Sequence, residues 1–219
     1  MRASLDTNVI IHMYKADRQG ILFDFFNEGV FIYEQIRVVE LENHGAEILD
    51  KVDKDISDGK IRLYTDDDLR AKGMYRVFMM KVEENRLLYN PGDLGEVYAI
   101  SLAQTLGAYS IVTDDIKQGG PYMSLLQFEG EEIMPFSFAD VLILRYLLGK
   151  ADAHQTVRDF DEINNSSELD WSFRSHLTRF IKRFIRDPYR NEDVEWLKTL
   201  ADSNKICVRD KLMVLKGII

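Results

Sequence analysis

One stretch of the sequence most constrains the fold. Residues 93–103 read Asp-Leu-Gly-Glu-Val-Tyr-Ala-Ile-Ser-Leu-Ala, and the apolar segment 109–112 follows shortly afterwards. Apolar residues recur in the first segment at three- and four-residue steps, which predicts a helix, and the second segment predicts a buried strand. Asp114 and Asp115 come just after that strand. A helix, a short loop and a strand with acids at its exit are typical of an open α/β sheet.

Acidic side chains recur at the corresponding points of other predicted elements. Ala3–Leu5 predicts a first strand, and Asp6 follows it directly. Further strands are predicted at 30–33, 61–64 and 133–136. Open α/β sheets bind ligands outside the carboxyl ends of their strands. The acids at two strand exits and at the start of the 93–103 helix therefore predict one shared acidic site.

The second part of the chain has a different pattern. Ser137 opens a helix that Gly149 closes, and everything after it reads as helical. We therefore predict an α/β domain over 1–149 and a helical extension over 150–219.

Charge and cysteine content limit the class of protein. Residues 151–219 hold 12 basic and 12 acidic side chains, so the net charge of −9 lies entirely in the first 150 residues. An acidic body argues against non-specific nucleic-acid binding but not against a metal site, since a divalent cation relieves repulsion between carboxylates. The single cysteine, Cys207, excludes an internal disulfide. Without a signal peptide or a long apolar run, a soluble cytoplasmic protein with no membrane partner is expected.

Four pieces of the chain, in this order, carry a family resemblance. They are Leu5-Asp6-Thr7-Asn8, the early-helix pair Glu40-Leu41, the Asp-x-Gly-Glu-x-x-Ala-Ile-x-Leu-Ala pattern of 93–103, and the strand ending Thr113-Asp114-Asp115. Together they resemble a PIN domain over roughly residues 1–150. The resemblance implies a three-layer fold with a central, mostly parallel sheet and a metal-dependent ribonuclease activity. Many such domains are toxins of toxin–antitoxin pairs, which makes an antitoxin or a second copy of the chain a possible partner.

The resemblance also implies the site residues. The catalytic acids would be Asp6, Glu40, Glu96 and Asp115, and the metal ligands Asp6, Glu96, Asp114 and Asp115. Thr7, Asn8, Asp93 and Thr113 would support them. Two alternatives stay open: Glu42 in place of Glu40, and a capping box in which Asp93 and Glu96 merely begin a helix.

The chemistry of these residues agrees with that implication. Phosphodiester hydrolysis needs an activated water and compensation of negative charge, and carboxylates supply both when they hold Mg²⁺ or Mn²⁺. Oxygen ligands select these ions, whereas the four histidines are scattered without ligand spacing, which argues against zinc.

Binding of RNA phosphates needs positive charge, and Lys117 is the only basic residue close in sequence to Asp114 and Asp115. A second source is a predicted amphipathic helix over 169–186, on which Phe173, Leu177, Phe180, Ile181, Phe184 and Ile185 form an apolar face. Arg179, Lys182, Arg183 and Arg186 recur on another face, which either contacts RNA or is simply solvated.

These observations predict a Mg²⁺- or Mn²⁺-dependent endoribonuclease, with a toxin role as one option. The alternative is a catalytically silent PIN-like module that binds RNA or a protein partner. A receiver-like phosphoacceptor domain fits poorly, because its paired acids should follow the first strand, whereas Asp114 and Asp115 follow a later one.

Overall fold

The computed structural model describes residues 1–88, 94–128 and 132–219. The chain forms two compact units, Met1–Ser137 and Phe138–Ile219. The first unit is α/β, as predicted, and the second is helical. The boundary lies one helix earlier than the predicted one, because the helix that begins at Phe138 groups with the C-terminal helices.

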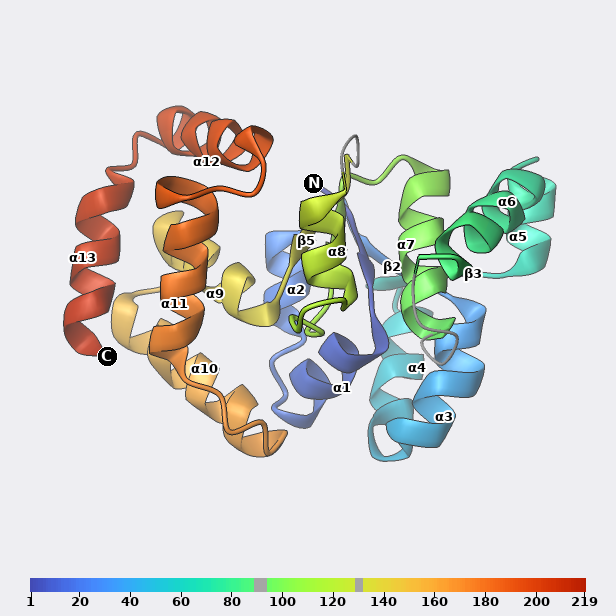
Figure 1. Cartoon of the computed structure of the whole chain (residues 1–219). Helices are drawn as coiled ribbons and strands as arrows, with labels where there is room; N and C mark the ends of the chain where they lie inside the picture. Colours follow the sequence, from blue (N-terminus) through green and yellow to red (C-terminus); the bar gives the residue numbers. More distant parts are fainter. Residues whose placement is uncertain (89–93, 129–131) are drawn as a thin grey trace. The chain divides into compact units, whose positions relative to one another are not determined.

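The first unit alternates strands and helical segments along the chain (Figure 1). Its described elements are β1 (Ala3–Leu5), α1 (Thr7–Lys15), α2 (Gly20–Phe25), β2 (Val30–Tyr33), η1 (Ile36–Glu40), α3 (Leu41–His44), η2 (Ala46–Ile48), α4 (Leu49–Ser57), β3 (Ile61–Tyr64), α5 (Asp66–Ala71), α6 (Tyr75–Arg86), α7 (Leu94–Leu106), β4 (Ser110–Val112), α8 (Pro121–Gln127) and β5 (Met134–Phe136).

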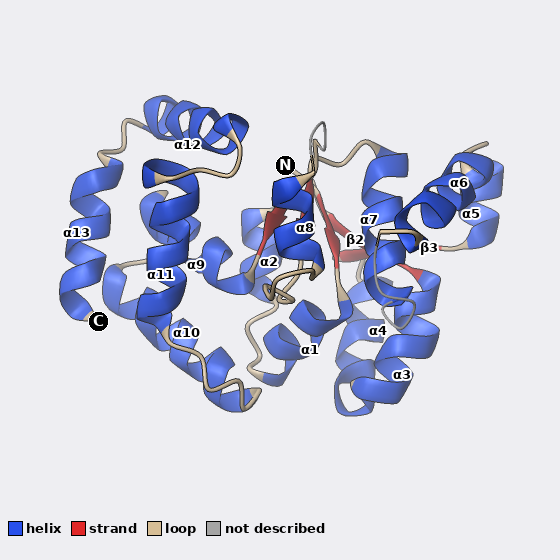
Figure 2. Ribbon diagram, in the orientation of Figure 1, coloured by secondary structure: helices blue, strands red, loops and turns tan. Residues whose placement is uncertain are grey.

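The five strands form one parallel sheet in the order β3-β2-β1-β4-β5. β1 is central and completely buried, with Ser4 aligned to Phe31 on one side and to Ile111 on the other. Parallel strands need crossover connections, and helices lie on both faces of the sheet (Figure 2). The observed three-layer α/β arrangement confirms the coarse fold class.

The direction of the connections reverses at β1. The chain moves from β1 outward through β2 to β3, and later from β4 on the other side of β1 outward to β5. In such sheets the crevice at the reversal point, beyond the carboxyl ends of the strands, is where ligands bind. Asp6 and Thr113 leave the two strands at this point, and the backbone amide of Asp6 still donates to the carbonyl of Val112 at 2.9 Å.

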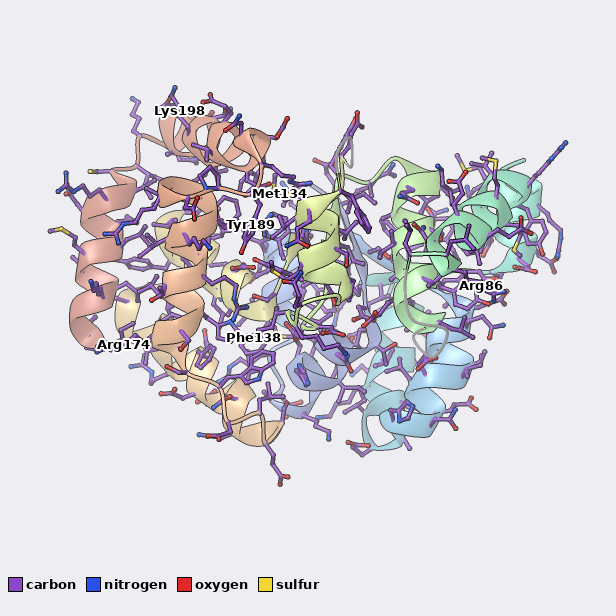
Figure 3. The ribbon with its side chains drawn as sticks, viewed as in Figure 1. Arg86, Met134, Phe138, Arg174, Tyr189 and Lys198 are labelled. Atoms are coloured by element: carbon purple, nitrogen blue, oxygen red, sulfur yellow. The ribbon has the colours of Figure 1, made fainter. Side chains whose placement is uncertain are left out.

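The second unit consists of α9 (Phe138–Leu147), α10 (Ala153–Ser166), α11 (Phe173–Ile181), η3 (Lys182–Arg186), α12 (Asn191–Asn204) and α13 (Val208–Ile218). Its core contains an aromatic cluster around Phe138, whose ring centroid lies 5.5 Å from that of Phe160 and 5.6 Å from that of Trp171 (Figure 3). Among the helices of the described ranges, none is both long enough and apolar enough to cross a membrane.

The predicted amphipathic helix over 169–186 differs from the observed structure in its last turn. α11 continues into η3, a five-residue π-helical turn, instead of further α-helix. A π-helical turn holds more residues than an α-helical one, so the face on which later side chains lie is shifted. Ile185, predicted to lie on the apolar face of this helix, is 44% exposed, whereas Arg183, predicted on the cationic face, is fully buried.

Arg183 is therefore a structural residue of the second unit. Its Nε donates to Oδ2 of Asp193 at 2.6 Å, and Arg190 donates to Oδ1 of the same carboxylate at 2.7 Å. Asp193 is completely buried as well. The prediction that Arg183 contacts RNA is wrong, because its guanidinium is buried in an ion pair inside the unit.

Candidate functional site

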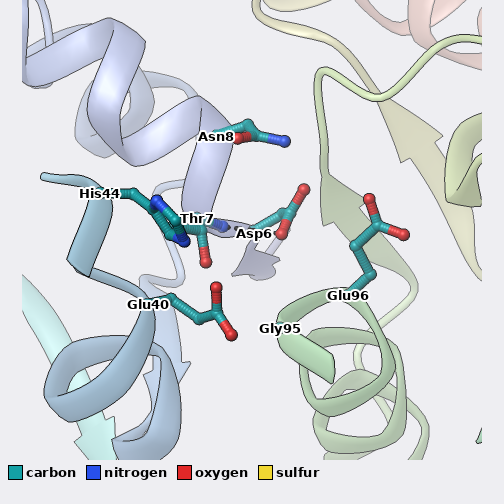
Figure 4. Close-up of a pocket in the computed structure, with 7 residues that line it drawn as sticks. All are labelled: Asp6, Thr7, Asn8, Glu40, His44, Gly95 and Glu96. Carbon is teal, nitrogen blue, oxygen red and sulfur yellow. Dashed lines mark hydrogen bonds between the residues drawn. The ribbon is translucent and has the colours of Figure 1, made fainter. Parts of the chain in front are cut away.

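A pocket of about 280 Å³ lies in the first unit at the carboxyl end of β1 (Figure 4). Three separate chain segments line it: the exit of β1, the η1–α3 segment and the first turn of α7. The lining residues are Asp6, Thr7, Asn8, Glu40, His44, Gly95 and Glu96. Five of them were predicted as site residues, and three of those five are carboxylates.

Asp6 is held rigidly at the base of this pocket. It caps α1, with Oδ1 accepting a hydrogen bond from the backbone amide of Thr7 at 2.7 Å. Its other oxygen, Oδ2, accepts from the hydroxyl of Thr113 at 2.9 Å. The predicted supporting role of Thr113 thus has a geometric basis, while Thr7 binds Asp6 through its backbone and not through its hydroxyl.

The environment of Asp6 disfavours its negative charge. The pKa of this carboxyl is raised from 3.8 to about 7, mainly because burial removes the group from water. The hydrogen bonds from Thr113 and Thr7 lower the pKa, and the negative charges of Asp114 and Asp115 raise it. A buried carboxylate with acidic neighbours is an unfavourable arrangement without a cation, and carboxyl groups with strongly raised pKa values cluster at functional sites.

Glu40, and not Glu42, faces the pocket. Glu40 ends η1, a π-helical turn, and π-helical turns are frequent at functional sites. Glu42 is exposed and accepts a hydrogen bond from Arg37 at 2.7 Å. The open choice between these two glutamates is therefore resolved in favour of Glu40 as the pocket-lining residue.

Gly95 lets α7 approach the other two segments. A Cβ atom built on Gly95 would lie 3.2 Å from Oγ1 of Thr7, 3.3 Å from Cγ of Glu40 and 3.4 Å from its carboxylate carbon. The hydroxyl of Thr7 and the carboxylate of Glu40 thus converge on one point above this glycine. Any larger residue at position 95 would push against both.

The hydroxyl of Thr7 is the clearest indication that the pocket takes a ligand. Thr7 is only 6% exposed, and its Oγ1 has no hydrogen-bond partner among the described residues. Figure 4 shows this oxygen directed into the same space as the Glu40 carboxylate. Buried polar atoms are nearly always hydrogen-bonded, so an unpartnered hydroxyl oxygen in a pocket lining points to a ligand that occupies the pocket.

Glu96 completes the acidic lining from the first turn of α7 and is 8% exposed. Its carboxylate is directed toward the same region as that of Asp6 (Figure 4). Asp93, predicted to cap this helix, lies outside the described residues, so the capping-box alternative for Glu96 stays open.

Asp114 and Asp115 do not line this pocket. Asp114 is buried, and its Oδ2 lies 2.8 Å from Nδ1 of His12 on α1. Asp115 pairs through Oδ2 with Nζ of Lys117 at 2.8 Å. Their negative charges raise the pKa of Asp6. Each carboxylate is itself paired with a side chain that does not line the pocket, His12 for Asp114 and Lys117 for Asp115. Their predicted role as metal ligands stays a prediction.

The loop that carries Asp115 depends on Gly120. A Cβ atom on Gly120 would stand 2.5 Å from Oδ1 of Asp115 and 2.8 Å from its carbonyl oxygen. The backbone amide of Tyr122 donates to that carbonyl at 3.3 Å. Only glycine fits between these groups, so the loop holds Asp115 in one place.

The remaining predicted RNA contacts have mixed surroundings. Lys117 is 70% exposed beside Asp115. In the second unit, Lys182 lies 3.5 Å from Asp187, Arg186 is exposed and Arg179 is half-buried. An RNA-binding role for these four residues stays a prediction.

The pocket fits a hydrated divalent cation in its donor chemistry. It offers carboxylate oxygens and an unpartnered hydroxyl, which are hard oxygen ligands. Within the described residues, no three His, Cys, Asp or Glu side chains form a group that could hold an ion. Mg²⁺ commonly keeps several waters and binds through one or two carboxylates, so a complete protein cage is not required.

Of the four histidines that argued against zinc, His44 lines the pocket, while His12 contacts Asp114 outside it. Glu40 and His44 are four residues apart, which places two side chains on one face of a helical segment. That spacing was the signal in the sequence that could have identified His44.

Comparisons of the chain with protein-family models, with curated proteins and with solved structures found no match.

Proposed function

We propose that the first unit is a PIN-like, Mg²⁺- or Mn²⁺-dependent endoribonuclease that hydrolyses phosphodiester bonds of RNA. The observation that carries the proposal is the convergence of Asp6, Glu40 and Glu96 on one pocket at the reversal point of a parallel sheet. The unpartnered hydroxyl of Thr7 in the same pocket supports it independently.

In this proposal one or two of the pocket carboxylates, those of Asp6, Glu40 and Glu96, would hold a hydrated cation. A bound divalent ion supplies an activated water and offsets the negative charge that develops on the phosphate oxygens. Thr7 and Asn8 line the same pocket, and in this proposal their side chains orient water or phosphate oxygens. Thr113 fixes the direction of the Asp6 carboxylate through the hydrogen bond to Oδ2.

Asp6 is also suited to move a proton. A carboxyl with a pKa near the working pH accepts and releases a proton most effectively, and the pKa of Asp6 is about 7. In this role Asp6 would accept the proton of the attacking water. A toxin role, an antitoxin partner and a homo-oligomer remain predictions that follow from the family resemblance.

A matched pair of glutamate variants tests the proposal. Glu40→Gln removes a charge from the pocket, whereas Glu42→Gln removes one from an exposed residue two positions away. With Mg²⁺ or Mn²⁺, we expect Glu40→Gln to lower cleavage of a pool of cellular RNAs by about a hundredfold. Glu42→Gln should cleave within about twofold of the wild type, because Arg37 keeps its two bonds to Asp53.

Asp6→Asn and chelation complete the test. Asp6→Asn should abolish cleavage and lessen, without removing, the rise in melting temperature that Mn²⁺ causes through binding to the folded state, because Glu40 and Glu96 still line the pocket. A melting temperature that is indifferent to millimolar Mn²⁺ after chelation would contradict the metal site. Wild-type protein that binds RNA but cleaves none of the RNAs tried would favour the silent binding module instead.

A further inference from the structure

The acidic pocket poses an electrostatic problem for a polyanionic substrate. Three of its seven lining residues are carboxylates, and neither lysine nor arginine is among them. Phosphate oxygens that enter the pocket must therefore be bound by a metal ion or by neutral or ionisable donors. Three described lining side chains can donate a hydrogen bond: those of Thr7, Asn8 and His44.

His44 differs from the other two donors in position and chemistry. Thr7 is buried, whereas Asn8 on α1 and His44 at the end of α3 are both exposed, and His44 follows Glu40 by one helical turn. Figure 4 shows its imidazole ring turned toward Thr7 and Glu40, with Glu96 on the far side of Asp6. Among the described lining residues, histidine is also the one that can carry a positive charge.

The backbone beneath His44 is fixed by close packing. Gly45 follows directly, and its backbone amide donates to the carbonyl of Leu41 at 2.9 Å. A Cβ atom on Gly45 would stand 3.1 Å from Cγ1 of Ile11 in α1 and 3.3 Å from Cδ2 of Leu41. The end of α3 is thus pressed against α1, which holds His44 and Asn8 on two elements beside the same pocket.

We infer that His44 donates a hydrogen bond to a phosphodiester oxygen of RNA bound in the acidic pocket. This inference rests on the proposed function, and it adds a substrate-contacting residue outside the set of acids. His44 binds the phosphate from the Glu40 side, and Asn8 lies on the α1 side. The two donors flank the phosphate while the carboxylates hold the cation.

The test measures binding separately from cleavage. The Asp6→Asn variant serves as the uncleaving background, and the probe is a fluorescein-labelled single-stranded RNA of about twelve nucleotides in Mg²⁺ buffer, read by fluorescence anisotropy. Adding His44→Ala should raise the Kd by on the order of tenfold, since it removes a hydrogen bond to a charged group. His44→Gln keeps an N–H donor and should stay within about threefold of the background.

His154→Ala is the matched control, because His154 is an exposed histidine of the second unit. It should leave the Kd unchanged. An unchanged Kd in His44→Ala would overturn the inference while leaving the proposed function standing. Background protein that does not bind the RNA at all, combined with wild-type protein that does not cleave it, would overturn both.

A second readout separates substrate contact from an indirect effect through Glu40. The rise in melting temperature caused by Mn²⁺ is measured for the wild type and for His44→Ala. An equal rise in both, together with the weaker RNA binding, supports direct contact. A smaller rise in His44→Ala with an unchanged Kd would show that His44 acts on the metal-binding carboxylates, and would overturn the inference.

Discussion

Gly95 and Glu40 approach each other so closely that a methyl group on Gly95 would stand 3.3 Å from Cγ of the glutamate. Gly95 belongs to the first turn of α7, whereas Glu40 ends the π-helical turn η1. The glycine therefore sets how near two of the three acidic segments come. A substitution at Gly95 should therefore change the geometry of the pocket more than the stability of the fold.

Gly95→Ala tests whether pocket geometry and fold stability respond differently. Alanine favours a helix over glycine by about 1 kcal/mol, which offsets the tight contacts, so the free energy of unfolding should change by less than about 1 kcal/mol. Displacing Glu40 and Thr7 by a few tenths of an ångström should lower metal-dependent RNA cleavage about tenfold or more. Urea unfolding and initial cleavage rates measure the two effects.

Gly217→Ala is the control for this substitution. Gly217 also lies in a helix, α13, and a Cβ atom there would meet nothing within 4 Å. It should keep full activity and be as stable as the wild type or slightly more stable. Full activity in Gly95→Ala would show that the pocket tolerates the extra methyl group.

Asp6 makes the stability of the metal-free protein depend on pH. Its pKa is about 7 in the folded state and close to 4 in an unfolded chain, so folding favours the protonated form. The stability that this protonated group contributes is fully present below about pH 4 and is lost as the pH rises through 7. Three pKa units correspond to an upper limit of about 4 kcal/mol.

Asp6→Asn cannot ionise and should abolish this pH dependence. In metal-free buffer the variant should be more stable than the wild type at pH 8, and the difference should shrink steadily toward pH 4. Thermal unfolding at several pH values measures it. Asp67→Asn, at a carboxylate that is 94% exposed, should follow the wild-type profile. Parallel profiles for wild type and Asp6→Asn would contradict the raised pKa.

Arg183 should matter for folding of the second unit and not for RNA binding. Arg183→Met removes one of two arginine partners from the buried Asp193, which should cost on the order of 3 kcal/mol in the free energy of unfolding. Arg186→Met changes an exposed residue and should cost less than about 0.5 kcal/mol. Urea unfolding of the two variants decides the matter, and equal stability would refute the structural role of Arg183.

The sheet could be predicted from the sequence because its strands are short and mostly apolar, although the edge strand β3 contains the exposed Arg62. Val30–Tyr33 and Ile61–Tyr64 were predicted with the observed bounds. Asp6 was placed at the pocket for the same reason, since the residue after a central parallel strand lies at the edge where ligands bind. Apolar runs of this kind can be read from the sequence because a strand that is buried on both faces carries apolar side chains at successive positions.

Predictions that assumed α-helical spacing were inaccurate at the π-helical turn η3 and left a choice open at the π-helical turn η1. At η3 the extra residue per turn brings Arg183 into the core, although spacing by 3.6 residues placed it among exposed cations. At η1 a similar turn ends at Glu40, and the sequence favoured Glu40 without excluding Glu42. His44 was missed because its place beside the pocket depends on the packing of Gly45 against Ile11.

The central position of β1 has a consequence for the order of folding. β1 is the first of the five strands along the chain, yet it needs β4 as well as β2 to complete its hydrogen bonds. The bond that orients Asp6 joins it to Thr113, 107 positions later. Pairing over such separations is slow, and during synthesis it waits until the distant strand has left the ribosome. A nascent chain that stops short of β4 has the first acid of the pocket but cannot assemble the site.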